Sequence, residues 1–152
     1  PDNRLANPEI QCGQEFEGRK VLILGDSITV GTPAGTSYAE RLASSCPRMQ
    51  FQKVAQGGVE TGWMYNQIKG RNLTQQGFDD LIILGGVNNL QNGKSVASIE
   101  DSLNLIYNQA KQQGLRVIAV TVTPWKGLGS WTPAKQQNTD EQTKISAKLT
   151  KL

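Results

Sequence analysis

Four short apolar runs, rich in β-branched residues, divide this chain into alternating segments. The runs cover residues 21–24, 51–55, 81–84 and 116–123. Segments with helical spacing lie between them, and the clearest, 95–113, has apolar residues at three- and four-residue steps and is followed by a glycine. Apolar runs without polar alternation are typical of strands buried on both faces. The alternation therefore predicts an α/β fold with a parallel sheet and right-handed crossovers.

The chain is long enough for one domain with a substantial core. Its 152 residues are 37% hydrophobic and 19% charged, as in typical globular proteins. We expect residues 1–19 to form an extended N-terminal arm, because they are polar and show neither a helical nor a strand period. Residues 20–152 then form the domain. The last segment, 135–152, contains good helix formers, and no fifth strand follows it, so either this helix covers the apolar sheet edge or the chain is incomplete.

The charge and the cysteine content indicate which partners and which cellular compartment to expect. The net charge is only +3 and the basic residues are scattered, so we expect no nucleic-acid partner. No apolar stretch approaches the roughly 20 residues of a membrane span. A bridge between Cys12 and Cys46 is favoured over two free thiols, and it suits an oxidising compartment. Together with a start at Pro1 rather than Met, this indicates a secreted or periplasmic protein.

Candidate chemistry lies in the loops that follow the first three apolar runs. Gly-Asp-Ser at 25–27 presents Ser27, which is a nucleophile once its proton is removed. Paired glycines at 57–58 allow a backbone N–H to approach a ligand without side-chain hindrance. Asn88 follows a second glycine pair, 85–86, and offers a carboxamide donor. Because the carboxyl ends of parallel strands meet at one sheet edge, these groups are expected to converge on a developing oxyanion.

Each motif alone also has an ordinary structural interpretation. Gly-Asp-Ser is a common turn sequence, and Asn88 can bond the backbone of its own loop. Three such loops after three strands favour the functional interpretation. Nucleotide binding is excluded, because no lysine follows Gly31 and the dinucleotide glycine spacing is absent. The tryptophans either line an acyl or carbohydrate platform or fill the core: Trp63, Trp125 and Trp131.

Residues 25–29, Gly-Asp-Ser-Ile-Thr, resemble the first block of the SGNH hydrolases, also called GDSL esterases and lipases. Gly58 is similar to the glycine of the second block, and residues 86–89 resemble the third block, Gly-x-Asn-Asp. The resemblance implies a three-layer α/β/α sandwich with a parallel, flavodoxin-like sheet. It also implies hydrolysis of esters or thioesters without metal or cofactor, and we expect the substrate to be a small-molecule or glycan ester. Ser27 would be the nucleophile, and the oxyanion hole would consist of the Ser27 N–H, the Gly58 N–H and the Asn88 side chain.

The chain departs from this family pattern in three places. Asn89 stands where the third block has aspartate. The second block lacks its leading asparagine, so Gly57 competes with Gly58 for the role of backbone donor. The fifth block, Asp-x-x-His, is absent, because the sequence contains no histidine. The family's catalytic base therefore has no counterpart here.

The missing base leaves three interpretations open. Asp26, Asp101 and Asp140 are poor substitutes, since an unperturbed aspartate has a pKa of about 3.9 and imidazole one of about 6.5. The chain is either part of a longer hydrolase, which we favour, or a catalytically silent binding module for an acyl or glycan ligand. In the third interpretation a complementing C-terminal segment that carries Asp-x-x-His docks onto it. The isolated chain is expected to be almost inactive, because hydrolases without a triad member retain only about 10³–10⁴-fold catalysis over water.

Overall fold

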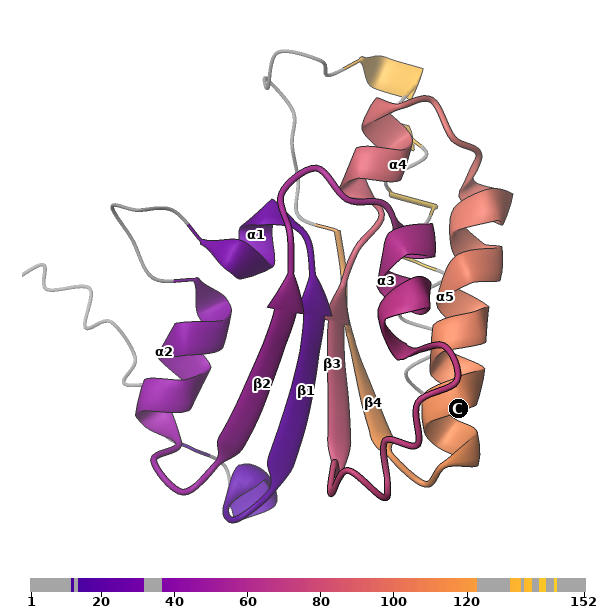
Figure 1. Ribbon diagram of the computed structural model, residues 1–152. Coiled ribbons are helices and arrows are strands. Elements are labelled where there is room, and N and C mark those ends of the chain that lie inside the picture. Colours follow the sequence, from indigo (N-terminus) through magenta and orange to yellow (C-terminus); the bar gives the residue numbers. More distant parts are fainter. Residues whose placement is uncertain are drawn as a thin grey trace, which may run out of the picture.

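The centre of the molecule is a four-stranded parallel sheet, shown in Figure 1. The computed structural model describes residues 12, 14–31, 37–122, 132–134, 136, 137, 140, 141 and 144. In the order β2-β1-β3-β4, the sheet contains β1 (Lys20–Gly25), β2 (Gln50–Ala55), β3 (Asp80–Leu84) and β4 (Arg116–Val120). The helices are the 3-10 turn η1 (Gln14–Phe16), α1 (Ser27–Val30), α2 (Tyr38–Ser45), α3 (Thr61–Ile68), α4 (Val87–Gln91) and α5 (Val96–Gln112). The four predicted strands and the predicted helix at 95–113 are confirmed, although β4 ends at Val120.

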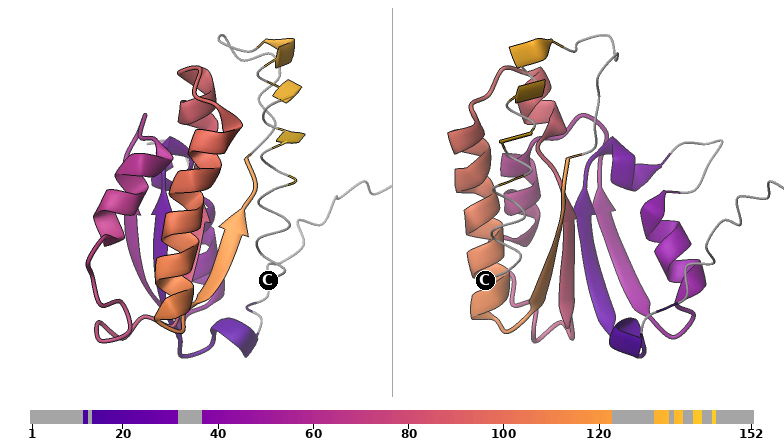
Figure 2. Two further views of the ribbon diagram at one scale, coloured as in Figure 1. Left: turned by 90° about the vertical axis from the view of Figure 1, so that its right-hand side faces the viewer. Right: turned by 180° about the vertical axis from the view of Figure 1, so that it is seen from behind.

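Two apolar cores lie on opposite faces of the sheet, because successive residues of a strand point to opposite sides. Leu22 and Leu24 contact the core that α3 and α5 cover. Val21 and Ile23 contact the core that α2 covers. The views in Figures 1 and 2 show these helices on either side of the sheet. The predicted three-layer α/β/α sandwich with a parallel, flavodoxin-like sheet is confirmed.

Burial along the strands follows their positions in the sheet. β1 lies between β2 and β3, and all but its first residue are buried. β3 lies between β1 and β4 and is buried throughout. β2 and β4 form the edges of the described sheet and are more exposed. All four strands run in the same direction, so their carboxyl ends share one edge of the sheet.

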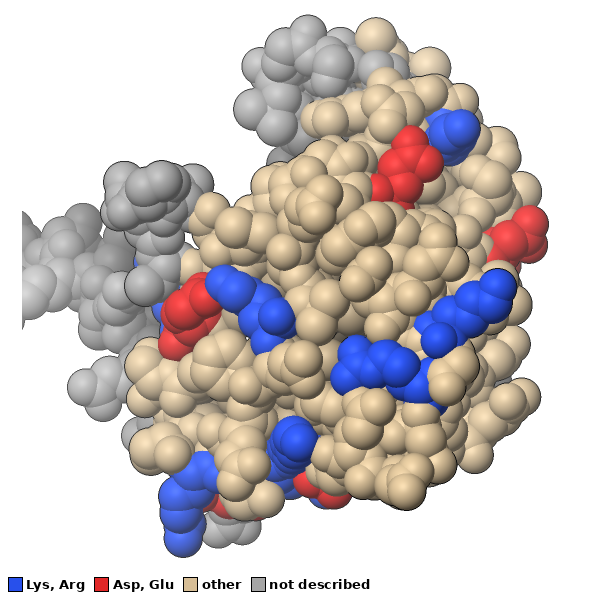
Figure 3. Space-filling view, in the orientation of Figure 1, with Lys and Arg blue, Asp and Glu red and all other residues tan. Residues whose placement is uncertain are grey.

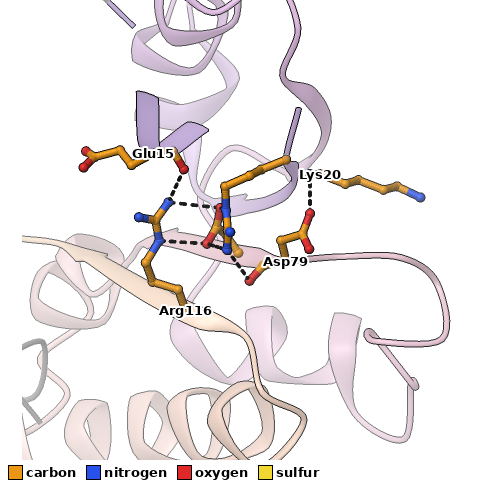
Figure 4. A network of polar contacts seen from close by, with 6 residues as sticks. Glu15, Lys20, Asp79 and Arg116 are labelled. Atoms are coloured by element: carbon orange, nitrogen blue, oxygen red, sulfur yellow. Dashed lines mark hydrogen bonds and ion pairs between the residues drawn. The ribbon is translucent and has the colours of Figure 1, made fainter. Parts of the chain in front are cut away.

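An ionic cluster closes the opposite edge, where the strands begin (Figure 4). Asp80 is fully buried and accepts hydrogen bonds from the guanidinium groups of Arg19, at 2.6 and 2.8 Å, and Arg116, at 2.8 and 3.2 Å. Burial by itself would raise the pKa of Asp80, but the bonds from both arginines outweigh it and hold the pKa below its ordinary value. Arg116 also donates to the main-chain oxygen of Glu15, 3.1 Å away. The cluster therefore joins β1, β3, β4 and η1.

The N-terminal arm is covalently tied to the domain. The predicted bridge is present: Cys12 and Cys46 form a disulfide that spans 34 residues of sequence. Phe16 of η1 packs against the core beneath α2. Residues 1–11 and 13 lie outside the described residues, and the division of the chain at residue 19 stays a prediction.

The C-terminal predictions lie largely outside the described residues. Of the helix predicted at 135–152, residues 136, 137, 140, 141 and 144 are described and are helical. Trp125 and Trp131 fall in the part that is not described. Trp63 packs, partly buried, against the core beneath α3 and α5, which favours the core interpretation for this tryptophan.

The described helices and the distribution of charged side chains bear on possible partners. Within the described ranges, no helix has both the length and the apolar character needed to cross a bilayer. On the face shown in Figure 3, lysine and arginine side chains lie in separate groups, with uncharged surface between them. The absence of a nucleic-acid partner stays a prediction.

Candidate active site

Three loops meet at the carboxyl edge of the sheet. They connect β1 to α1, β2 to α3, and β3 to α4, and Figure 1 shows all three beyond the arrowheads of the strands. These are the loops that carry Ser27, Gly58 and Asn88. This edge is where open α/β sheets bind their ligands.

The first loop presents Ser27 on a sharp turn. A Cβ on Gly25 would lie 1.8 Å from the Thr29 Oγ1, so only glycine fits where β1 enters this turn. Asp26 caps the short helix α1, because its Oδ1 accepts the Ile28 N–H at 2.9 Å. Asp26 is fully buried, whereas Ser27, the first residue of α1, is exposed. The turn thus displays the serine at the sheet edge.

Asp26 itself is an unusual carboxyl group. Burial raises its pKa, and the hydrogen bond from the Ile28 N–H acts in the opposite direction. Among the described residues, its second oxygen, Oδ2, is buried and has no hydrogen-bond partner. Because its Oδ1 is used as the cap of α1, Asp26 supports the turn under the serine.

The second loop runs close beside Ser27. A Cβ built on Gly57 would lie 3.8 Å from the Ser27 Cβ, and the Gln56 N–H donates to the Gly25 oxygen at 3.3 Å. Gly58 has a φ of +76°, a left-handed conformation that favours glycine. Gly57 and Gly58 are both exposed. The glycine pair therefore forms an open stretch of backbone next to the serine.

The third loop is bonded to the second through Asn88. Its Nδ2 donates to the Val59 oxygen at 2.8 Å, and Val59 belongs to the second loop, 29 residues earlier in the sequence. The alternative in which Asn88 bonds its own loop is therefore wrong. An amide nitrogen carries two hydrogens, and this bond uses one of them. A Cβ on Gly85 would lie 2.6 Å from the Met64 Sδ, so the glycine lets this loop pack closely on the Met64 side chain of α3.

Asn89 shows how an amide can stand where the family pattern has a carboxylate. Its side chain is buried, and its Oδ1 accepts the Thr61 N–H at 3.0 Å. This contact needs an acceptor oxygen, which asparagine and aspartate both supply. The substitution therefore keeps the link between the second and third loops.

Glu60 is not among the site residues predicted from the sequence. Its carboxylate lies between the two loops, with the Asn92 Nδ2 at 2.7 Å and the Asn89 Nδ2 at 3.5 Å. The only local signal is an acidic residue directly before α3, which is also common in ordinary helix starts. Its partners lie 29 and 32 residues away in sequence, so local patterns do not reveal them.

The other two aspartates considered as substitutes for the missing base, Asp101 and Asp140, lie outside the three loops. Asp101 is exposed on α5, and Asp140 accepts a hydrogen bond from Gln136 at 2.9 Å. Within the part of the chain that the structure describes, no group of three or more His, Cys, Asp or Glu residues is arranged to hold a metal ion.

Comparison of the sequence with protein-family models identifies the family. The model of the GDSL-like Lipase/Acylhydrolase family matches residues 23–151. The chain belongs to this family. The family is one of hydrolases, and the recognition based on the three sequence blocks is confirmed. No curated protein matches the sequence of this GDSL-like protein.

Solved structures show the same fold. AlinE4, described as an SGNH-hydrolase family esterase, has a TM-score of 0.72 and 21% identity, over 89% of this chain and 74% of its own. A member of the lipolytic protein G-D-S-L family from Veillonella parvula DSM 2008 has a TM-score of 0.71 and 20% identity, over 86% and 71%. The acetyl xylan esterase AlAXEase has a TM-score of 0.69 and 16% identity, over 87% and 72%. The GDSL-like protein therefore has the fold of SGNH hydrolases.

Proposed function

We propose that this GDSL-like protein carries the nucleophile and oxyanion hole of a serine ester hydrolase. Ser27 is the nucleophile, and the oxyanion donors are its own N–H, the Gly58 N–H and the Asn88 Nδ2. The observation that supports this most strongly is the bond from Asn88 to the Val59 oxygen, since it attaches the side-chain donor to the residue after Gly58. Gly57 beside Ser27 brings the same loop to the nucleophile.

In the proposed reaction the Ser27 Oγ attacks the carbonyl carbon of the ester while a base removes its proton. The carbonyl oxygen becomes an oxyanion, which the three N–H donors stabilise. The intermediate then collapses, the alcohol leaves with a proton from the base, and the acyl group remains on Ser27. Attack by water on this acyl-serine releases the acid and restores the hydroxyl.

The base is proposed to come from a segment that carries Asp-x-x-His, since this sequence contains no histidine. Imidazole takes the proton of the serine, and the aspartate orients the ring and stabilises its charged form. Ser27 and the neighbouring Gly57 and Gly58 are exposed, which leaves this side of the hydroxyl accessible to a group from another segment. In this proposal the described chain is one component of the complete site.

The proposed substrates are esters of small molecules or glycans. The acetyl xylan esterase among the similar structures makes acetyl groups on glycans a reasonable first class to assay. The proposed reaction needs no cofactor, because the nucleophile, donors and base are all side-chain or backbone groups. We also propose a secreted or periplasmic location, which the Cys12–Cys46 disulfide supports, since such bridges persist in oxidising compartments.

Turnover of p-nitrophenyl acetate in the presence of free imidazole tests the proposal. Imidazole supplies the absent base, so the wild-type chain is expected to show saturable hydrolysis above the imidazole background. Ser27→Ala should reduce the rate to that background. Asn88→Ala should lower the rate by roughly 10²–10³-fold, as expected for one oxyanion donor. Equal rates for the wild type and Ser27→Ala would refute a serine hydrolase.

A catalytically silent binding module is the second candidate, and the absence of histidine favours it. Such a module would bind an acyl or glycan ligand but give no Ser27-dependent turnover with imidazole. Neither Ser27→Ala nor Asn88→Ala would then change the rate, so the same experiment separates the two functions.

A further inference from the structure

We propose that Glu60 is a positioning residue that fixes the spacing between the two loops that carry Gly58 and Asn88. The inference rests on the proposed function, because it concerns the geometry of the oxyanion donors. It assigns a role to a carboxylate that does not touch the substrate and acts through its neighbours.

Hydrogen bonds from three consecutive residues, 59–61, link the second loop to the third. The Val59 oxygen accepts from Asn88 at 2.8 Å, and the Thr61 N–H donates to Asn89 at 3.0 Å. Between these two hydrogen bonds, the Glu60 carboxylate accepts from the Asn92 Nδ2 at 2.7 Å and lies 3.5 Å from the Asn89 Nδ2. Three successive residues of one loop thus bond to the other loop.

Hydrogen bonds fix both the backbone and the side chain of Glu60. Its main-chain oxygen accepts the N–H groups of Trp63 and Met64, at 3.1 and 3.3 Å, which fixes its backbone at the start of α3. It occupies the N-cap position, yet its side chain makes no cap bond to α3 and reaches the α4 side instead. A shift of α4 relative to α3 would therefore break the Glu60–Asn92 bond and move Asn88 relative to Gly58.

The chemistry of the Glu60–Asn92 pair makes a rescue experiment feasible. An ionised carboxylate only accepts hydrogen bonds, and the asparagine Nδ2 only donates them. Asn92→Asp places two acceptors of like charge against each other. Adding Glu60→Gln restores a donor, because the new glutamine amide can donate to the new aspartate, and the net charge returns to that of the wild type.

The experiment measures Ser27-dependent, imidazole-supported turnover in this set of variants. A displacement of about 1 Å can cost about 10² in rate, so Glu60→Ala should lower kcat by up to about 100-fold with little change in KM. Asn92→Asp should lower kcat roughly tenfold, and Asn92→Asp with Glu60→Gln should recover most of that loss. Asp101→Asn, which alters an exposed carboxylate on α5, is the matched control and should retain wild-type kcat.

A second measurement separates this inference from the proposed function. The NMR signals of the Asn88 side-chain amide should move in Glu60→Ala and Asn92→Asp and return in the double variant, whether or not the chain turns over ester. If the wild type shows no Ser27-dependent turnover but the signals behave in this way, the proposed function fails and the positioning role stands. Unmoved signals, or an unchanged kcat in Glu60→Ala and Asn92→Asp in an active wild type, would overturn the positioning role.

Discussion

Gly25 and Gly62 differ in the space around the hydrogen that replaces a side chain. A Cβ on Gly25 would collide with Thr29, whereas a Cβ on Gly62, inside α3, would meet no atom within 4 Å. The first glycine is needed for the turn that displays Ser27, and the second only adds freedom to the unfolded chain. The residue type is the same, and the surroundings decide its importance.

Gly25→Ala should destabilise the protein by at least about 1–3 kcal/mol, the usual cost of overpacking, and should displace α1. Gly62→Ala is the matched control and should stabilise the protein by about 0.5–1 kcal/mol, because alanine is the better helix former. Urea unfolding of the two variants measures both free energies. Equal stability of Gly25→Ala and the wild type would contradict the turn described for residues 25–29.

Asp26 predicts a pH dependence of definite sign. Burial raises the pKa of this carboxyl in the folded protein. Between the ordinary pKa and the raised one, the folded state binds more protons than the unfolded state, so stability falls as pH rises through this window. Asp26→Asn removes that titration and keeps an acceptor for the Ile28 N–H.

The free energy of unfolding of the wild type, minus that of Asp26→Asn, should therefore decrease as pH rises above the ordinary aspartate range. The difference should level off once pH exceeds the raised pKa. Urea unfolding at a series of pH values gives this difference directly. A difference that stays constant, or that grows with pH, would show that Asp26 is not held in a desolvating site.

Among the strands and helices, the sequence predicts best those elements whose residue pattern is determined by burial. The apolar runs at 21–24 and 81–84 became β1 and β3, because a strand covered on both faces requires apolar side chains throughout. Two short helices, α1 and α4, were not predicted, since five or fewer residues show no helical period. The three-loop site was expected from topology, whereas the Glu60 contacts depend on tertiary packing.

The Asp80 cluster joins the beginnings of three strands, so the loss of its carboxylate should destabilise the sheet. Asp80→Asn would leave Arg19 and Arg116 without their charged partner, and the expected cost is about 3 kcal/mol. This is the lower end of the range for buried pairs, since the arginine side chains are 36% and 38% exposed. Urea unfolding measures the loss.

Glu17→Gln is the matched control for the Asp80 variant. It removes an ion pair with Arg48, whose side chain is 78% exposed. Exposed pairs contribute about 0–1 kcal/mol, so the control should lose at most about 1 kcal/mol. Similar losses for both variants would contradict the role of Asp80 as a buried anchor.

Across the described molecule, the disulfide and the ionic cluster hold Cys12 and η1 near one edge of the sheet, and the candidate site lies at the other edge. The positions of the two cysteines, Cys12 before the first strand and Cys46 after the first long helix, favour the bridge. Cysteine spacing alone did not decide it, because bridge formation depends on how closely the fold brings the two residues together.

Reduction of the disulfide should lower the free energy of unfolding by about 3–4 kcal/mol, because the bridge closes 34 residues of chain. Unfolding curves with and without a thiol reductant measure this loss. The reductant should have no effect on the double variant Cys12→Ala with Cys46→Ala. If reduction leaves the wild-type curve unchanged, the arm does not depend on the bridge for its stability.

In the proposed active site the Ser27 hydroxyl faces the N–H donors of the two neighbouring loops. Labelling with a p-nitrophenyl phosphonate in imidazole buffer, followed by peptide mass spectrometry, tests it most directly, since the adduct mimics the tetrahedral intermediate. We expect a single adduct on Ser27, formed at least about 10²-fold more slowly in Asn88→Ala. An adduct on another residue, or equal labelling of the wild type and Ser27→Ala, would rule out this arrangement.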